Sequence, residues 1–255
     1  MDNEKYYESF DWSSFKDSSS NFKVIAQLIP EDVNSILDIG CGNGLITNEL
    51  AKKYQVVGVD RSKAALEFVK GDKIEASCDS VPVEDQSFDM VLSSELLEHL
   101  DAPTFEKTIK ELERISKKYI LVGVPNQESL IKGLTVCPEC KTQFHNCYHQ
   151  QSFNSVKIEN LFNNYNLVQA IECGIQVRSY SNFLYGIKKR LVPSKYVEPY
   201  YWTQKKRHQP FCPKCEKQLK MPVNFNLFSF LIDSLNSLIS KKKKFHLIAL
   251  LEKKN

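Results

Sequence analysis

The sequence has no hydrophobic run long enough to cross a membrane. No apolar stretch among its 255 residues approaches the roughly 18–20 residues that a transmembrane helix needs. The N-terminal stretch MDNEKYYESFDWSSF is acidic and aromatic, so it lacks the basic start and the apolar segment of a secretion signal. We therefore expect a cytoplasmic protein.

A disulfide framework is also excluded, although the chain contains eight cysteines. Disulfides persist mainly in exported proteins, and nothing in this sequence directs export. Internal repeats and long low-complexity tracts are missing as well. With 42% hydrophobic and 25% charged residues, the chain can bury one α/β core, with or without a small lobe.

Acidic residues are scarce in the last third of the chain. Residues 178–222 hold eleven Lys or Arg against two acids, and residues 223–255 hold six Lys against two acids. Because the whole chain carries a net charge of only +3, the residues before 178 must be strongly acidic. An acidic N-terminal part and a basic C-terminal part predict two regions with different functions.

Strand and helix patterns alternate regularly along much of the chain. Apolar runs predict strands at 34–40, 55–60, 73–79, 88–94, 118–126, 166–177 and 245–254. Amphipathic or apolar stretches predict helices at 45–54, 62–70, 102–117, 154–165 and 224–240. This alternation predicts the α/β class, with a Rossmann-like, doubly wound and mostly parallel seven-stranded sheet.

A glycine-rich turn lies between the first predicted strand and the first predicted helix, in ILDIGCGNGLITNEL. Its glycines, Gly40, Gly42 and Gly44, permit positive φ angles and let the backbone approach a ligand closely. Dinucleotide-binding enzymes use a similar turn, but with G-x-G-x-x-G spacing. Asp38, just before the turn, could face a cationic ligand, and Asp60 ends the second strand, placed to accept hydrogen bonds from both hydroxyls of a ribose.

Four motifs in this order resemble the class I S-adenosylmethionine-dependent methyltransferases, in particular the group typified by ubiquinone-biosynthesis and sugar methyltransferases. They are LDIGCGNG, VVGVD, CDSVPVEDQSFDMVLSSELLEHL and YILVGVPN. The resemblance covers about residues 33–177 and the last strand, and it is specific for fold and cofactor but not for substrate. A dehydrogenase-type nucleotide-binding domain is the alternative.

The resemblance implies a role for each residue of these motifs in binding S-adenosylmethionine. The glycine loop, with Cys41, and Asp38 would hold the methionine part, and Asp60 the ribose. The positions around the adenine and the floor of the site would be Arg61, Cys78, Asp79, Ser93, Ser94 and Glu95. An acidic pocket suits this ligand, because its sulfonium and ammonium groups are cationic.

Methyl transfer needs an aligned acceptor and, when the acceptor is a hydroxyl, a general base. The candidates are Glu95, Glu98, His99, His145 and His149. Related enzymes often carry a His-x-x-Ser-Phe-like stretch over the active site, which implies substrate contact for His149. His99 could instead pack the start of its helix, and His145 could neighbour a metal or lie on the surface. We expect His149, His99 and Glu95 to be catalytic.

Two Cys-Pro-x-Cys knuckles, Cys137 with Cys140 and Cys212 with Cys215, have the spacing of a structural zinc site. Each tight turn lets two thiolates point at one ion, and four thiolates complete a closed tetrahedral shell. Free thiols or a redox pair are the alternatives, although a redox pair normally begins a helix after a strand. The sequence therefore predicts a small zinc-binding accessory lobe.

The regular alternation of strands and helices is interrupted at 126–152 and at 178–222. These interruptions divide the chain into six predicted segments. They are an N-terminal lid or substrate segment (1–32), a cofactor-binding core (33–125), an insertion with the first knuckle (126–152), a core helix and strand (153–177), a basic aromatic insertion with the second knuckle (178–222), and a C-terminal helix with the last core strand (223–255). In the first segment, Tyr6, Tyr7, Phe10 and Trp12 would form a lid or pack on the core.

The leading hypothesis is methyl transfer to an anionic small-molecule or glycan-type acceptor, at a hydroxyl oxygen. The basic aromatic stretch 185–211 could instead dock transfer or ribosomal RNA, which makes an RNA methyltransferase the first alternative. A non-catalytic, cofactor-binding regulatory protein is the second. The helix at 224–240, followed by Lys241–Lys244, could touch an anionic membrane, but we expect it to pack under the last strand. The oligomeric state stays open.

Overall fold

The computed structural model describes residue 8 and residues 11–14, 19–193, 197–198, 210–219 and 225–254. The chain divides into two compact units. The core unit comprises Asn3–Asn126, Phe153–Ile175 and Lys244–Asn255, and the accessory unit includes Gln127–Ser152 and Gln176–Lys243.

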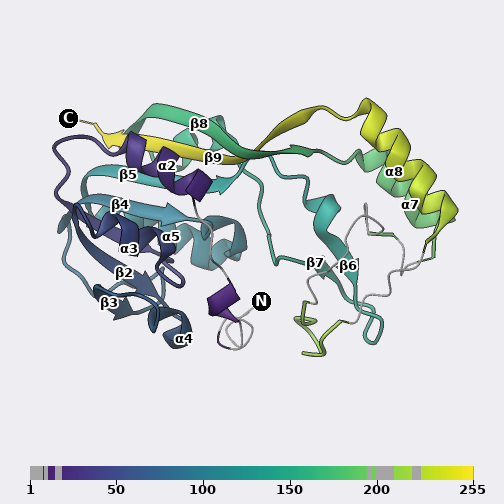
Figure 1. The fold of residues 1–255 in the computed structure, drawn as a ribbon, viewed down its shortest axis with the longest axis horizontal. Coiled ribbons are helices and arrows are strands. Elements are labelled where there is room, and N and C mark those ends of the chain that lie inside the picture. Colours follow the sequence, from purple (N-terminus) through teal and green to yellow (C-terminus); the bar gives the residue numbers. More distant parts are fainter. Residues whose placement is uncertain are drawn as a thin grey trace. The chain divides into compact units, whose positions relative to one another are not determined.

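A seven-stranded sheet in the order β3-β2-β1-β4-β5-β9-β8 organises the core unit (Figure 1). The strands are β1 (Ser35–Ile39), β2 (Gln55–Asp60), β3 (Asp72–Glu75), β4 (Phe88–Ser94), β5 (Ser116–Pro125), β8 (Tyr165–Arg178) and β9 (Lys242–Lys253). The first five pair in parallel, and β9 runs antiparallel to β5. This confirms the predicted Rossmann-like, mostly parallel seven-stranded sheet.

Helices cover both faces of the sheet. They are α2 (Ser19–Leu28), α3 (Leu45–Leu50), α4 (Lys63–Leu66), α5 (Ala102–Ile115) and α6 (Ser155–Leu161), with short 3-10 turns η1 (Trp12–Ser14) and η2 (Leu97–His99). Residues of the types preferred at helix N-termini cap two of these helices. The side chain of Ser62 accepts a hydrogen bond from the amide of Ala65 at the start of α4, and Asp101 caps α5, which has Pro103 in its first turn.

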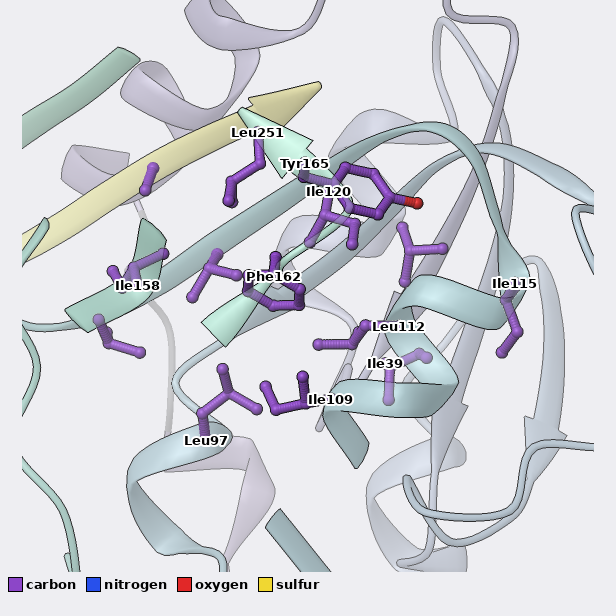
Figure 2. Packing of buried hydrophobic residues seen from close by; sticks show 14 of the residues in the cluster. Ile39, Leu97, Ile109, Leu112, Ile115, Ile120, Ile158, Phe162, Tyr165 and Leu251 are labelled. Atoms are coloured by element: carbon purple, nitrogen blue, oxygen red, sulfur yellow. The ribbon is translucent and has the colours of Figure 1, made fainter. Parts of the chain in front are cut away.

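The side chains of the central strands β1, β4, β5 and β9 alternate between two apolar clusters, one on each face of the sheet. Ile39 and Ile120 belong to the cluster that α5 and α6 close with Leu112, Phe162 and their neighbours (Figure 2). Ile36 belongs to the other cluster, which α2 and α3 close. Burial on both faces explains why these strands read as continuous apolar runs.

In the core unit, several predicted boundaries change in the structure, and one helix was not predicted. The first two helices, α3 and α4, end at Leu50 and Leu66, several residues before the predicted ends at 54 and 70. Helix α2 lies within the segment predicted as a lid, because Ile25, Leu28 and Ile29 bury its apolar face in the core. Propensity alone does not decide where a short helix stops, since tertiary packing supplies most of its stability.

The accessory unit contains a hairpin of β6 (Leu134–Val136) and β7 (Gln143–His145), the turn η3 (Leu130–Gly133), and the helices α7 (Asn182–Leu191) and α8 (Leu227–Ile239). Helix α7 and the hairpin were not predicted. The expectation that α8 packs under the last strand is wrong. Its fully buried residues are Ser229, Asp233 and Asn236, and it belongs to the accessory unit.

Candidate functional site

The glycine turn connects β1 to α3 with three residues in the left-handed region. Gly40, Gly42 and Gly44 have φ angles of 78°, 52° and 71°. A Cβ atom on Gly40 would lie 2.9 Å from a methyl carbon of Leu96, and one on Gly44 would lie 2.8 Å from Val69. Both the backbone angles and the space therefore require glycine here.

Two carboxylates border this turn. Asp38 is 97% buried, and its Oδ2 accepts a hydrogen bond from the hydroxyl of Thr47 at 2.6 Å. Burial raises the pKa of Asp38 to about 7, and the nearby charge of Asp60 adds to the effect. Burial also raises the pKa of Asp60, although the amides of Gly42 and Ser62 each donate to it at 2.8 Å. Two partly desolvated acids at one sheet edge favour a cationic ligand.

The carboxyl end of β4 lies beside that of β1, because Asp38 pairs with Leu92 in the sheet. Strand order reverses between β1 and β4, which is where open α/β sheets bind ligands. Within the described residues, the hydroxyls of Ser93 and Ser94 are buried without a hydrogen-bond partner. Buried hydroxyls are normally paired, so these two provide polar groups for a ligand at this edge.

Glu95 follows β4 with a positive φ of 57°, and its Oε1 lies 2.9 Å from Nδ1 of His246. His246 pairs with Pro125 across β5 and β9, which brings the last strand to the same sheet edge. Gly174 has a φ of 79°, and a Cβ atom there would lie 2.7 Å from the His246 ring. Sequence reasoning did not find His246, although a glycine inside a strand is a signal of close approach.

Cys78 and Asp79 lie on the loop after β3. The hydroxyl of Thr108 contacts the Cys78 sulfur at 3.3 Å, and Ser77 donates to Asp79 at 2.5 Å. Arg61 is exposed just beyond β2. The core unit therefore carries all the residues predicted for cofactor binding, which lie at or just beyond the carboxyl ends of β1, β2, β3 and β4.

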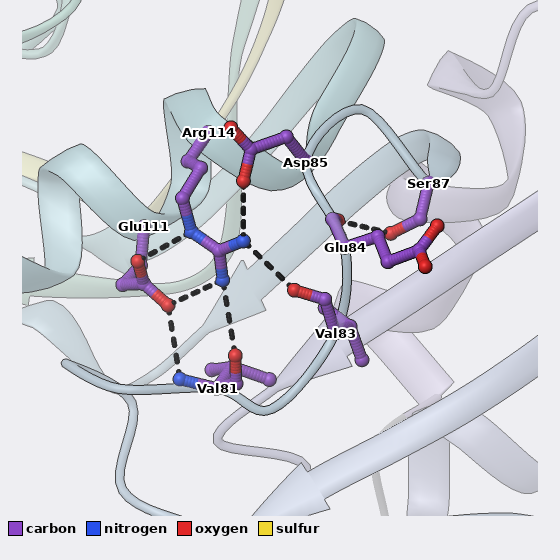
Figure 3. A network of polar contacts seen from close by, with 7 residues as sticks. All are labelled: Val81, Val83, Glu84, Asp85, Ser87, Glu111 and Arg114. Atoms are coloured by element: carbon purple, nitrogen blue, oxygen red, sulfur yellow. Dashed lines mark hydrogen bonds and ion pairs between the residues drawn. The ribbon is translucent and has the colours of Figure 1, made fainter.

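An arginine network fixes the loop that continues from Asp79 (Figure 3). The guanidinium of Arg114 donates to the carbonyls of Val81 and Val83 and to the carboxylates of Glu111 and Asp85, at 2.7–3.0 Å. These acids raise the pKa of Arg114 further above its ordinary value. Helix α5 thereby holds the loop that follows the predicted adenine contacts.

Of the four aromatic residues predicted to form a lid, the structure describes Trp12. Its carbonyl accepts a hydrogen bond from the side-chain amide of Asn43 at 2.9 Å, and its ring would lie 3.2 Å from a Cβ atom on Gly42. Tyr6, Tyr7 and Phe10 lie outside the described residues. The N-terminal segment thus reaches the glycine turn through Trp12.

His99 ends the turn η2 in the core unit, next to the fully buried Glu98. Its Nε2 lies 4.0 Å from a carboxylate oxygen of Glu98. His149 belongs to the accessory unit, where its Nδ1 lies 2.5 Å from Oε2 of Glu128. Sequence reasoning did not single out Glu128.

A stacked pair of histidines surrounds Glu128. The rings of His145 and His149 stack with centroids 4.8 Å apart. Nδ1 of His145 accepts from the amides of Cys147 and His149, so in the neutral ring Nε2 carries the proton. Burial lowers the pKa of His145 to about 4, so this ring is neutral near pH 7. A protonated Nε2 cannot bind a metal, and this cluster is better suited to hold His149 than to hold an ion.

The four knuckle cysteines come together in the accessory unit. Their sulfurs all lie within 4.8 Å of one another, with 3.6 Å between Cys137 and Cys215 and 3.4 Å between Cys140 and Cys212. Sulfurs around a tetrahedral zinc are about 3.8 Å apart, given Zn–S bonds of about 2.3 Å. The donor set therefore fits a zinc ion and leaves no open coordination position.

The two knuckles have the same backbone geometry although they are far apart in sequence. In each, the amide four residues after the first cysteine donates to that cysteine's carbonyl, at 3.1 Å for Lys141 and 2.8 Å for Glu216. These two residues have positive φ angles of 62° and 57°. Tyr148, which was not predicted, bonds to both the amide and the carbonyl of Phe211 and so ties the knuckles together.

Most of the basic aromatic stretch lies outside the described residues, including 199–209. Among the helices that the structure does describe, none is long and apolar enough to span a bilayer.

Comparison with known proteins identifies a shared domain. Residues 37–119 match the family described as a methyltransferase domain. An uncharacterized protein of Methanocaldococcus jannaschii is 37% identical over 119 residues, which is 44% of this chain and 51% of that protein. A ubiquinone biosynthesis O-methyltransferase of Coxiella burnetii is 32% identical over 105 residues, which is 37% of this chain and 44% of that protein. The chain thus spans about half the length of the curated relatives it matches.

Solved structures share the fold at low sequence identity. A SAM-dependent methyltransferase from Archaeoglobus fulgidus superposes with a TM-score of 0.51 at 14% identity, covering 91% of this chain and 93% of that chain. At this identity the likeness establishes the fold alone. The shared fold and the matched domain are both consistent with a cofactor site at the sheet edge where the predicted residues lie.

Proposed function

We propose that this chain, a class I S-adenosylmethionine-dependent methyltransferase by its fold and by the domain at residues 37–119, methylates a small-molecule or glycan-type acceptor at a hydroxyl oxygen. The observation that carries the cofactor assignment is the pair of desolvated carboxylates, Asp38 and Asp60, at the switch point of the sheet. A dinucleotide would bring an anionic pyrophosphate to this edge, and buried Asp38 would repel it.

In this proposal, the cofactor supplies a methyl group that its sulfonium already activates. Asp38 attracts the cationic methionine part, and Asp60 accepts hydrogen bonds from the ribose through lone pairs left beside its two amide contacts. The hydroxyls of Ser93 and Ser94 orient the ligand at the end of β4. The residues thus act by positioning, which is the main requirement of an in-line displacement.

Calorimetry with S-adenosylmethionine tests this assignment, with a nicotinamide dinucleotide as the competitor. We expect binding of the first ligand only, weakened at least about tenfold in Asp60→Ala, because one well-placed hydrogen bond to a charged group contributes about 1.5–3 kcal/mol. Tight binding of the dinucleotide without S-adenosylmethionine binding would refute the proposal. Binding of S-adenosylmethionine without any turnover would favour the regulatory alternative.

A carboxylate–imidazole pair in either unit can serve as the general base. In the core unit, Glu95 contacts His246, and in the accessory unit, Glu128 contacts His149. A His whose Nδ1 proton is held by a carboxylate presents Nε2 as an acceptor, which supports His149 as the base. If His149 is the base, we expect His149→Ala to lower kcat at least about 100-fold with unchanged cofactor affinity. If the pair of Glu95 and His246 is the base, Glu95→Gln should have this effect instead.

We also propose that the four cysteines hold one structural zinc ion. Their mutual distances and matched knuckle geometry support this assignment. The ion would close the accessory unit around Tyr148 and place His149, four residues beyond His145 in the hairpin, without taking part in the transfer. Metal analysis of the purified protein should give one zinc per chain.

A further inference from the structure

Helix α8 has its polarity reversed relative to an ordinary surface helix. Ser229, Asp233 and Asn236, spaced at i, i+4 and i+7, are fully buried. Its other side exposes six large apolar residues to solvent by 47–83% of their surface: Leu227, Phe228, Leu231, Leu235, Leu238 and Ile239. A helix of a water-soluble protein normally shows the opposite pattern.

Polar contacts with α7 explain why the polar side faces inward. The ammonium of Lys188 donates to Asp233 at 2.7 Å, and both side chains are fully buried. The hydroxyl of Tyr180 donates to the same carboxylate at 2.6 Å, and Asn236 accepts from the amide of Ser181 at 2.9 Å. Rotating α8 to bury its leucines would break this network and leave buried charges unpaired, which is strongly unfavourable.

Helix α7 extends the exposed apolar surface. The two helices lie side by side (Figure 1), and α7 exposes 75% of Phe183 and 59% of Leu191. We call these two residues and the six of α8 the α7–α8 apolar face. Eight large apolar side chains exposed on two neighbouring helices are uncommon in a protein surrounded only by water, and they indicate an interaction site.

The exposed charged residues on and directly after these two helices are cations. Lys189 and Arg190 end α7, and Lys241, Lys242 and Lys244 follow α8, all of them exposed. Among the described residues of the accessory unit after Gln176 and up to Pro193, and again from Phe225 to Lys243, Asp233 is the single acid, and it is buried against Lys188. An exposed apolar face on two helices whose described exposed charges are cationic is complementary to an anionic lipid surface.

We propose that the α7–α8 apolar face binds the interface of an anionic membrane. The leucines and phenylalanines enter the boundary between headgroups and acyl chains, while the lysines contact lipid phosphates. A second copy of this chain fits less well, because it would bring the same cationic border to the contact. The proposal is independent of methyl transfer, since it concerns binding alone.

Vesicle co-sedimentation of the full chain tests the proposal. We expect the protein to sediment with vesicles of phosphatidylcholine and phosphatidylglycerol, and at least about tenfold less with phosphatidylcholine alone. Raising the salt from 0.05 to 0.5 M should weaken the first interaction because surface charges are screened. If the protein stays in solution with both kinds of vesicle, the proposal is wrong.

Substitutions locate the contact. Leu231→Asp and Leu238→Asp should each reduce sedimentation at least about tenfold, because an acid replaces an inserted apolar side chain. Both side chains are exposed, so folding should be retained, which circular dichroism checks. Val156→Asp is the matched control, since Val156 is 60% exposed on α6 of the core unit. Equal loss of binding in the control would contradict the assignment.

Replacing Lys241 and Lys242 together by Gln should weaken binding to the anionic vesicles about 30-fold, at about 1 kcal/mol per basic residue. Binding to anionic vesicles that this double variant leaves unchanged would contradict the role of the lysines. Size-exclusion chromatography tests whether the α7–α8 apolar face instead binds a second copy of this chain. A dimer that Leu238→Asp dissociates, without vesicle binding by the wild type, would overturn the proposal in favour of a second copy.

Discussion

The core unit and the accessory unit are stabilised in different ways. In the core unit, strands such as β1 and β5 bury apolar side chains on both faces, and the polar residues gather at one sheet edge. In the accessory unit, a described cluster of five buried apolar residues is joined by a buried ion pair and four close cysteines, which hold distant segments together. The first kind of unit depends on total buried area, and the second on a few specific contacts.

The largest difference between the units should follow loss of a knuckle. Cys212→Ser should abolish zinc binding and unfold the accessory unit, since metal-binding free energy is folding free energy in such sites. The core unit should remain folded, because no knuckle cysteine contributes to its core. Metal analysis and limited proteolysis measure the two effects. Cys147→Ser is the control, and zinc loss there would contradict the four-cysteine site.

The buried ion pair provides the next largest effect. Lys188→Met should destabilise the accessory unit by about 3–5 kcal/mol, because the Asp233 carboxylate stays buried without its partner. The double change Lys188→Met with Asp233→Leu should recover most of this loss. Native-state hydrogen exchange of the α7 and α8 amides measures it separately from the core unit. A double variant no more stable than the single one would argue against a simple charge effect.

A smaller effect tests the acidic edge of the core unit. Burial raises the pKa of Asp38 to about 7, so this carboxyl is largely neutral at pH 6 and ionised at pH 8. Affinity for cationic S-adenosylmethionine should therefore fall about tenfold per pH unit below 7, or about 1.4 kcal/mol. Asp38→Asn should bind S-adenosylmethionine more weakly. It should also remove the part of the pH dependence of affinity that comes from Asp38, so that only the titration of the ligand itself remains. Calorimetry from pH 5.5 to 8.5 measures the ratio of the wild-type affinity to the Asp38→Asn affinity at each pH.

The smallest effect concerns the backbone of the second knuckle. Glu216 has a φ of 57°, a region that disfavours side chains by about 1–2 kcal/mol. Glu216→Gly should raise the stability of the accessory unit by up to about 1 kcal/mol with zinc retained. Glu139→Gly is the contrasting variant, because the residue before Cys140 has no positive φ. Equal stabilities of the two variants would contradict the strain argument.

Periodic patterns predicted the core unit well. Two strands, β2 and β4, have the predicted boundaries. Asp38 and Asp60 lie near the ends of the expected strands, and the glycine turn follows β1. Their structure is local: a buried strand, a turn that needs positive φ and a carboxylate at the strand end all leave signals in neighbouring residues. The residues predicted to bind the cofactor therefore lie where the motifs placed them in the sheet, and their role in binding stays a prediction.

Long-range contacts explain what was missed. His246 reaches Glu95 from 151 residues away, and Glu128 and Tyr148 complete clusters around residues that were predicted. Helix α8 was assigned to the core because its composition is apolar. Composition does not say which face of an apolar helix is buried, and the partner Lys188 reverses the usual choice.

The sequence by itself determined the sheet, the glycine turn, the acids around it and the two knuckles, because each depends on residues close together in the chain. The sequence predicted that the two knuckles share one site, and the tertiary structure brings their four sulfurs together. Tertiary structure alone decided that His246 contacts Glu95 and that α8 presents its apolar face to solvent. The physical reason is that burial and pairing are settled by partners far away in sequence, and a local pattern cannot name those partners.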